Sequence, residues 1–295
     1  MYESFYGFKR GPFEISPDPY FLLATARHCE ALASLYYGVT RHKGFVVMSG
    51  DVGTGKTLLV SCLLELLRSR QAAFAHVFNP ALSIVQFLQY VTAEFGLPST
   101  GKTKTDLLLQ LNQYLIKRCQ NGLTTVLVID EAQHLNRRML EEIRLLTNLE
   151  TAQQKLLQIV LVGQSELEQQ LQYPDLRQLR QRIALWCRLA PLSGQETAEY
   201  IERRLTLASA APRKDSLFAP ESIALIYVYT RGVPRLINIM CDNALVAAYA
   251  RQGSIVTPDI VEEIASDLCL KLGPTHSSDN GNCGHTAETV VEKSV

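Results

Sequence analysis

Short apolar runs alternate with amphipathic stretches up to about residue 190. The runs are nearly free of charge, as in strands that are covered on both faces, and the stretches between them repeat apolar positions at helical spacing. We expect strands within residues 44–50, 72–80, 124–130, 156–163 and 183–192. We expect helices within residues 26–40, 57–70, 81–96, 104–122 and 137–150. This alternation predicts an open, mostly parallel α/β sheet flanked by helices.

The pattern changes after about Pro191, where strands give way to helical segments only. Four such segments lie within residues 193–210, 219–232, 233–253 and 257–272. They predict a smaller, all-helical lid domain behind the α/β core. Upstream, Thr105 or Asp106 is expected near the N-cap of the 104–122 helix.

Both ends of the chain differ in composition from its middle. Residues 1–25 are rich in Pro, Phe and Tyr and are expected to form an extended lead-in. The polar residues 273–295 are expected to be a disordered tail. The predicted division is a lead-in and first helix over residues 1–43, an α/β core over 44–190, a helical lid over 191–272 and a tail over 273–295.

Composition narrows the class of protein only a little. The chain has 295 residues, 47% of them hydrophobic, with 29 basic and 29 acidic side chains, so no dominant nucleic-acid or membrane surface is indicated. Its seven cysteines are scattered without a CxxC pair, which argues against a zinc site. The first residues lack an apolar signal-peptide region, and no stretch approaches about 20 apolar residues. We therefore expect a soluble cytoplasmic protein.

A glycine-rich turn joins the first strand to the helix that follows it. Gly50, Gly55, Lys56 and Thr57 match the pattern G-x-x-x-x-G-K-[S/T], in which backbone N–H groups and a helix N-terminus bind phosphate. Lys56 is expected to reach the β- and γ-phosphates, and the Thr57 hydroxyl to bind Mg²⁺. A chance turn is the alternative, and the strand-to-helix context argues against it. The expected nucleotide-binding residues are Gly50, Asp51, Val52, Gly53, Thr54, Gly55, Lys56, Thr57, Leu58, Asp130 and Arg235.

An acidic pair ends the strand within residues 124–130. If this strand lies beside the first one, Asp130 is expected to hold Mg²⁺ together with Thr57, directly or through water. Glu131 then orients the attacking water and acts as its general base. The alternative is an ordinary acidic helix start. A water-activating Glu is not required in a small-molecule kinase, and no N-K-x-D segment for guanine is present, so ATP is favoured over GTP.

Further polar residues complete the predicted catalytic set. Gln164 follows a buried strand and either contacts the γ-phosphate and water or is a turn residue. Arg182 and, second, Arg180 precede the last strand, as an arginine finger for a neighbouring subunit or as a solvated basic face. Arg235 starts a lid helix and either senses the γ-phosphate or contacts an acidic neighbour. The candidate catalytic residues are Glu131, Lys56, Gln164, Arg182, Arg180 and Arg235.

In this order the motifs resemble those of the AAA+ ATPases, over roughly residues 1–270. The segments "YGFKRGPFEISPDP", "IDEAQHL", "LLTNLE", "LRQLRQRI" and "GVPRLINIMCDNAL" are similar to secretion ATPases of the general-secretion-pathway protein A type. The run "RLLTNLE…KLLQIVLVGQSELEQQL" is similar to the ATPases for biogenesis of the mannose-sensitive haemagglutinin (MSHA) pilus.

The resemblance implies a role for each motif. Lys56 and Thr57 correspond to Walker A, and Asp130 and Glu131 to Walker B. Gln164 takes the sensor-1 position, where many relatives carry Asn. Arg182 or Arg180 corresponds to the arginine finger and Arg235 to sensor 2. The adenine is expected under the N-terminal segment near Pro12 and Phe13, together with the lid.

The function implied by the resemblance is ATP hydrolysis, with ATP and Mg²⁺ as cofactors, coupled to assembly of a type IV-like pilus or of secretion machinery. The expected partners are further copies of the chain, in a possible nucleotide-dependent ring, and inner-membrane assembly proteins. Because the transmembrane and cell-wall-binding parts of some relatives are absent from this sequence, attachment to the inner membrane is expected through partners. An ATP-dependent DNA-binding regulator of the transposition type and a slow nucleotide switch are the alternatives.

Overall fold

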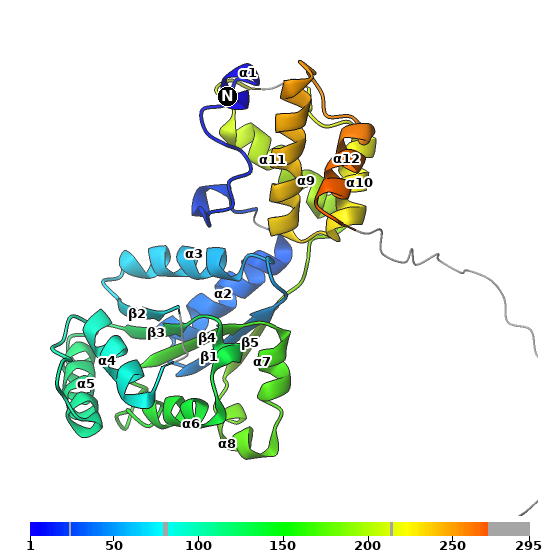
Figure 1. Ribbon diagram of the computed structural model, residues 1–295. Coiled ribbons are helices and arrows are strands. Elements are labelled where there is room, and N and C mark those ends of the chain that lie inside the picture. The colour runs from blue at the N-terminus through cyan, green and yellow to red at the C-terminus, as the bar shows by residue number, and fades with distance from the viewer. Residues whose placement is uncertain (24, 79–81, 213–214, 271–295) are drawn as a thin grey trace, which may run out of the picture.

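The computed structural model describes residues 1–23, 25–78, 82–212 and 215–270 (Figure 1). Its centre is a five-stranded sheet in the order β2-β3-β4-β1-β5, with every pairing parallel. The strands are β1 (Phe45–Gly50), β2 (Ala73–Val77), β3 (Thr125–Ile129), β4 (Gln158–Gly163) and β5 (Leu185–Leu189). The predicted disordered tail lies outside the described residues.

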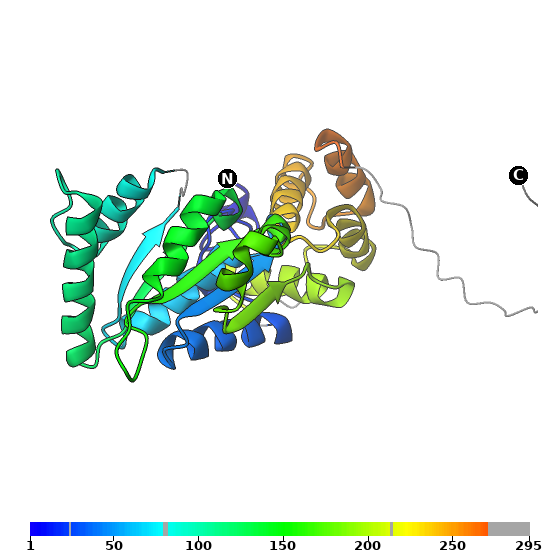
Figure 2. The same cartoon turned by 90° about the horizontal axis from the view of Figure 1, so that it is seen from below.

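Successive residues of each strand point to opposite faces of the sheet, and both faces are buried. Val46 and Val128 pack with α2 (Ala26–Thr40) and α3 (Lys56–Arg68), whereas Val47 and Leu127 pack on the opposite side. That opposite side is covered by α4 (Ile84–Glu94), α5 (Lys104–Gln120), α6 (Arg137–Leu146), α7 (Ser165–Gln170) and α8 (Arg177–Arg180). The helices lie on both sides of the sheet in Figure 2. This arrangement confirms the predicted open, parallel α/β sheet flanked by helices.

The order of the strands corrects one expectation. The strand that ends before Asp130, β3, does not lie beside β1, because β4 is inserted between them. All three strands are parallel, so their carboxyl ends meet at one edge of the sheet. This edge carries the loop after Gly50, the pair Asp130 and Glu131, and Gln164, as expected for ligand sites of open α/β sheets.

The helical region forms a second group of buried side chains. It consists of α9 (Gly194–Ala208), α10 (Pro220–Thr230), α11 (Pro234–Ala250) and α12 (Pro258–Asp267). Leu205, Ile226, Ile237 and Val261 are among the fully buried residues at its centre. The proposed boundaries of the core and lid domains stay predictions, while the helical content of this region is confirmed.

The N-terminal segment is part of this helical region and is not an extended lead-in. It holds the short helix α1 (Tyr2–Phe5) and the 3-10 turn η1 (Pro19–Phe21). Its aromatic residues supply the reason, because Tyr6, Phe8 and Phe13 are buried among the lid side chains. The backbone of Lys9 also donates a 2.8 Å hydrogen bond to the Ala208 carbonyl of α9. In Figure 1 the blue segment lies beside α11.

Side-chain caps fix where several helices begin. The N-cap of α5 is Thr103, and Thr105 and Asp106 lie near it in the first turn of the helix, as expected. The Thr103 hydroxyl accepts a hydrogen bond from the Asp106 backbone, and the Asp106 carboxylate accepts one from the Thr103 backbone. This reciprocal pair is a capping box, so Asp106 acts three residues inside the helix. Ser83 and Ser193 start α4 and α9 in the same way.

A glycine contact closes the base of the lid. The Leu192 amide donates a 2.8 Å hydrogen bond to the Gly232 carbonyl, which ties the segment before α9 to the segment before α11. Gly232 has φ of +73°, and a Cβ placed on it would lie 1.8 Å from the Leu192 carbonyl oxygen. Both the backbone conformation and this close approach require glycine.

We predict that Gly232→Ala lowers the free energy of unfolding by roughly 3 kcal/mol, because left-handed strain adds to a backbone clash. Gly101→Ala is the matched control, since Gly101 has φ of +73° with no atom within 4 Å of its added Cβ. It should lose only about 1 kcal/mol, from strain alone. Urea unfolding of both variants measures the difference, and equal losses would show that the contact with Leu192 is unimportant.

Candidate functional site

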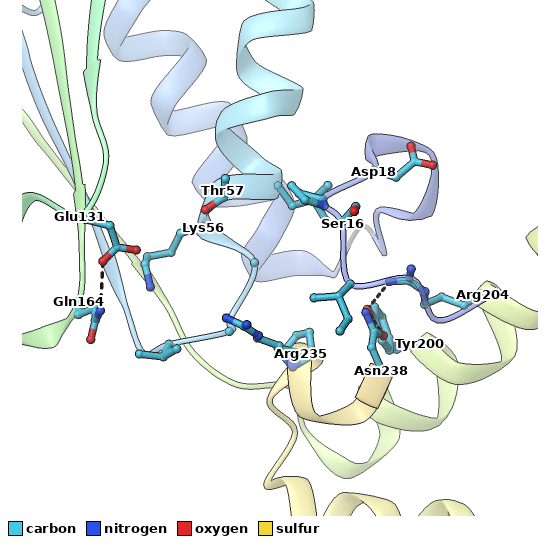
Figure 3. Close-up of a pocket in the computed structure, with 17 residues that line it drawn as sticks. Ser16, Asp18, Lys56, Thr57, Glu131, Gln164, Tyr200, Arg204, Arg235 and Asn238 are labelled. Carbon is cyan, nitrogen blue, oxygen red and sulfur yellow. Dashed lines mark hydrogen bonds between the residues drawn. The ribbon is translucent and has the colours of Figure 1, made fainter. Parts of the chain in front are cut away.

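A pocket of about 330 Å³ lies between the sheet edge and the helical region (Figure 3). The core contributes the loop from Val52 to Leu58, with Glu131 and Gln164 behind it. The opposite wall comes from residues 15–18 and from the lid. Its lid residues are Tyr200, Arg204, Pro234, Arg235 and Asn238. The pocket thus brings together most of the predicted site residues, and it adds several that sequence reasoning missed.

The loop after β1 has the backbone that a phosphate cradle needs. Gly53 and Gly55 adopt φ of +80° and +95°, which is accessible to glycine without strain. Gly55 is also the N-cap of α3 and has no side chain to satisfy the first N–H groups of the helix. Those N–H groups and the positive end of the α3 dipole therefore remain available to an anion.

Lys56 is folded back onto this loop. Its side-chain Nζ donates hydrogen bonds to the carbonyl oxygens of Gly50, at 2.8 Å, and Asp51, at 2.9 Å. Burial lowers the pKa of Lys56, while the nearby carboxylates of Glu131 and Asp130 act in the opposite direction. A buried ammonium group with only carbonyl partners is well suited to attract phosphate oxygens.

Thr57 and Asp130 meet across the sheet edge, although they are far apart in sequence. The Thr57 Oγ1 donates a 3.3 Å hydrogen bond to Asp130 Oδ2. Within the part of the chain that the structure describes, no cluster of three His, Cys, Asp or Glu residues could hold a metal alone. One hydroxyl and one carboxylate suit Mg²⁺ when phosphate oxygens and water complete its shell, so this donor pair fits that ion.

Glu131 is held at the head of the pocket by two amide side chains. Its Oε2 accepts hydrogen bonds from Gln133 Nε2, at 2.5 Å, and from Gln164 Nε2, at 3.2 Å. Burial acts to raise the pKa of Glu131, but these two hydrogen bonds and the charge of Lys56 outweigh it and leave the pKa below its usual value. The carboxylate is therefore ionised at neutral pH.

Gln133 is a polar residue of this site that sequence reasoning missed. Besides its bond to Glu131, its Oε1 accepts a 3.1 Å hydrogen bond from the Gln164 backbone. It thereby links the end of β3 to the end of β4. The signal in the sequence is an amide two positions after Glu131, which is visible but has no meaning until β3 and β4 are known to be neighbours.

Arg235 connects the lid to the phosphate loop. Its backbone N–H donates a 3.2 Å hydrogen bond to the Gly53 carbonyl, and a Cβ on Gly53 would lie 2.8 Å from the Arg235 Cβ. The side chain is exposed and lines the pocket. Figure 3 shows it between the core residues and the group of Tyr200, Arg204 and Asn238.

The two finger candidates lie outside the pocket of their own chain. Arg182 donates hydrogen bonds to Thr147 and to Asn148 Oδ1, the latter at 2.6 Å, at the end of α6. Arg180 is exposed, and no residue in the described ranges accepts a hydrogen bond from its guanidinium group. Arg182 is therefore occupied within its own chain, whereas Arg180 is free to reach another molecule.

The N-terminal contribution to the pocket is shifted from the expected residues. Pro12 and Phe13 were expected near the base of a nucleotide, but both are buried, and Phe13 packs edge-on against Phe218 at 6.1 Å between ring centres. The following residues, Ile15 to Asp18, line the pocket instead. The Phe13 ring lies in the lid core and not in the pocket, because burial in the core removes more of its apolar surface from water.

The chain is similar to known proteins in sequence and in fold. The AAA domain family matches residues 39–171. General secretion pathway protein A of Aeromonas hydrophila is 44% identical over 252 residues, which cover 85% of this chain and 45% of that protein. The chain thus spans less than half the length of this curated relative.

Solved structures share the fold at low sequence identity. The ORC2 protein of Aeropyrum pernix, in ADPNP–ADP complexes, has a TM-score of 0.64 at 20% identity, over 88% of this chain and 72% of that one. Cdc6p from Pyrobaculum aerophilum gives 0.65 at 16% identity, over 90% and 70%. The RuvB branch migration motor of Thermotoga maritima gives 0.55 at 18% identity, over 83% and 70%. The chain thus has the fold of the P-loop AAA+ ATPases, matches the AAA domain family over residues 39–171, and is similar in sequence to general secretion pathway protein A.

Proposed function

We propose that the chain hydrolyses ATP with Mg²⁺ and that this cycle drives or regulates assembly of a type IV-like pilus of the MSHA kind, or of related secretion machinery. The placement of Glu131 carries the hydrolytic part of the proposal. Its ionised carboxylate faces the same pocket as Lys56 and the N-terminus of α3. A carboxylate placed beside a phosphate cradle can orient water and accept its proton.

Nucleotide binding rests on the phosphate loop. The N–H groups at the start of α3 and the Lys56 ammonium group bind the β- and γ-phosphates, so Lys56 exchanges its carbonyl partners for phosphate oxygens. Thr57 and Asp130 hold Mg²⁺, which would neutralise charge on the phosphates when bound. The proposed roles rest on the chemistry of these side chains and N–H groups and on their position at one edge of the sheet.

Gln164 and Arg235 make the conformation of the protein depend on whether the γ-phosphate is present. Gln164 contacts Glu131 and can donate a hydrogen bond to the γ-phosphate or to the attacking water. Arg235 reaches the γ-phosphate from the lid, and loss of that phosphate releases it. Hydrolysis of ATP then changes the position of the lid relative to the α/β core.

The first prediction from this mechanism compares two loop substitutions. Glu131→Gln should keep ATP affinity within about twofold and lower kcat by about 10² to 10⁴-fold, because the amide cannot accept the proton. Lys56→Ala should lose ATP binding itself. Calorimetric titration with ATP and a phosphate-release assay separate the two effects. An unchanged kcat in Glu131→Gln would show that Glu131 is not the general base.

We also propose that the active form is an oligomer in which Arg180 acts on the ATP of a neighbouring subunit. Arg180 is exposed and unpartnered within the described residues, whereas Arg182 binds the end of α6. This reverses the order in which the sequence alone ranked the two arginines. A guanidinium group supplied in trans stabilises the charge that develops on the γ-phosphoryl group.

Mixing variants tests this assignment. Arg180→Ala should lower kcat by about 10³-fold with folding unchanged, and mixing it with Lys56→Ala subunits should restore part of the turnover. In the mixture, an ATP-binding subunit lies beside a neighbour that still has its arginine. Arg182→Ala should instead lower the melting temperature, since it removes hydrogen bonds from the end of α6. If mixing with Lys56→Ala subunits restored the turnover of Arg182→Ala and not that of Arg180→Ala, Arg182 would be the arginine finger.

The role in secretion is inferred from the relative and from the chain's own sequence. The similarity to general secretion pathway protein A covers most of this chain. No helix among the described residues is long and apolar enough to cross a bilayer. We place the protein in the cytoplasm, in contact with inner-membrane pilus or secretion proteins, which would bring it to the membrane surface.

A DNA-bound regulator is the second candidate, and one surface feature favours it. Arg41, Lys43 and Arg70 surround Tyr36 and Tyr37 at the end of α2, and none of the three cations forms an ion pair within the described ranges. Such a cluster can attract phosphates even when the net charge of the chain is zero. One structure with the same fold, the ORC1 protein of Aeropyrum pernix, is described as a complex with DNA.

Turnover measurements distinguish the two candidates. If the chain is an assembly ATPase, long duplex DNA should leave kcat unchanged. Inner-membrane pilus proteins in detergent should raise kcat about threefold or more. For the regulator, kcat should rise with DNA, and the rise should fall steeply between about 50 and 200 mM salt, because cations on the protein displace counterions. Stimulation by DNA with that salt dependence would rule out the pilus assignment.

A further inference from the structure

A buried arginine of the lid lines the pocket at the end opposite Glu131 (Figure 3). Arg204 is 4% exposed and stands on α9. Its Nε donates a 2.6 Å hydrogen bond to the Pro12 carbonyl, and its Nη2 donates a 3.2 Å bond to the Glu14 carbonyl. Its Nη1 donates a 2.6 Å bond to the Tyr200 hydroxyl. The guanidinium group also stacks over the Phe21 ring, 4.5 Å from its centre.

This arginine has no acidic partner among the described residues, and its hydrogen bonds go to two carbonyls and a hydroxyl. A guanidinium group cannot lose its proton in a protein, so burial leaves a full charge, which these hydrogen bonds and contacts with the Phe21 and Tyr200 rings stabilise. These hydrogen bonds consequently fix Arg204 and the backbone of the N-terminal segment relative to each other.

Asn238 of α11 makes a second connection to the same segment. Its Nδ2 donates a 3.3 Å hydrogen bond to the Glu14 carbonyl, and its Oδ1 accepts a 2.9 Å bond from the Tyr200 hydroxyl. Arg204, Tyr200 and Asn238 therefore form one network that joins α9, α11 and the N-terminal backbone, as the dashed lines in Figure 3 trace in part. We name residues 12–18 the strap.

Four strap residues line the pocket, the polar Ser16 and Asp18 and two apolar ones. Ile15 and Pro17 line the pocket, and Ile15 is 59% exposed there. They line the same pocket as the phosphate loop, and we take this wall as the side toward which the base of a nucleotide held by Lys56 would extend. Exposed apolar surface beside such a site is suited to a flat aromatic ring.

We propose that Arg204 is a positioning residue, which fixes the strap to the lid as the base-side wall of the nucleotide pocket. The proposal rests on the nucleotide binding proposed above. Within the described residues, the hydrogen bonds of Arg204 go to the strap and to Tyr200 and not to the phosphate loop. It therefore supports the base half of the ligand and leaves the triphosphate half to Lys56 and α3. It also makes the wall part of the lid, although the strap lies far from the lid helices in sequence.

The test compares ATP with inorganic tripolyphosphate, which lacks the base, both with Mg²⁺. Arg204→Met keeps most of the side-chain volume but removes every donor. It should weaken ATP binding about tenfold or more and change tripolyphosphate binding by less than about twofold, measured by calorimetry on the full chain. A merely structural defect would weaken both ligands equally. Arg203→Met is the matched control, because Arg203 is exposed and, among the residues that the structure describes, donates a single hydrogen bond, of 3.3 Å, to the Leu22 carbonyl.

Milder variants decide the matter if Arg204→Met does not fold. Arg204→Lys keeps the charge without the fork of donors, and Tyr200→Phe removes the shared hydroxyl. Each should weaken ATP selectively, by about threefold or more. Equal losses for both ligands, or unchanged ATP affinity in these folded variants, would overturn the proposal. A wild-type chain that binds neither ligand would contradict the proposed function, whereas one that binds both equally would contradict only the role of the strap.

Discussion

At Gly53 the phosphate loop and the lid come into direct backbone contact. The Gly53 carbonyl accepts a hydrogen bond from the Arg235 amide, and there is no room for a Cβ between them. The same residue needs a left-handed φ to turn the loop. One glycine therefore satisfies two constraints at once, because it shapes the cradle and sets how closely α11 approaches it. The pocket, and the reach of the Arg235 side chain into it, depend on this contact.

Electrostatics in the pocket reinforce this geometry. Burial lowers the pKa of Lys56, and the neighbouring Glu131 and Asp130 oppose that shift. Glu131 in turn stays ionised because Gln133, Gln164 and Lys56 outweigh its own burial. The Lys56 ammonium group and the Glu131 carboxylate thus stabilise each other's charged forms within one pocket. A neutral net charge for the chain conceals this local separation of charge.

Local patterns were enough to predict most of the core. Each strand is a buried run with a turn after it, so its existence and its carboxyl-end residues, such as Asp130 and Gln164, follow from the sequence. The order of the strands does not, because β4 enters between β1 and β3 through contacts between segments far apart in sequence. Gln133 and Arg204 were missed for the same reason. Each is an ordinary polar residue of a turn or helix until its distant partner is known.

The lid reaches both halves of the pocket. Arg235 approaches the phosphate end from the start of α11, and Asn238, less than one turn further along that helix, holds the strap at the other end. Because α11 is a single packed helix, a displacement at Arg235 also moves Asn238, and with it the wall formed by Ile15. Loss of the γ-phosphate would then loosen the base-side wall as well as the arginine. Under the proposed function, nucleotide release would then be coupled to movement of the lid.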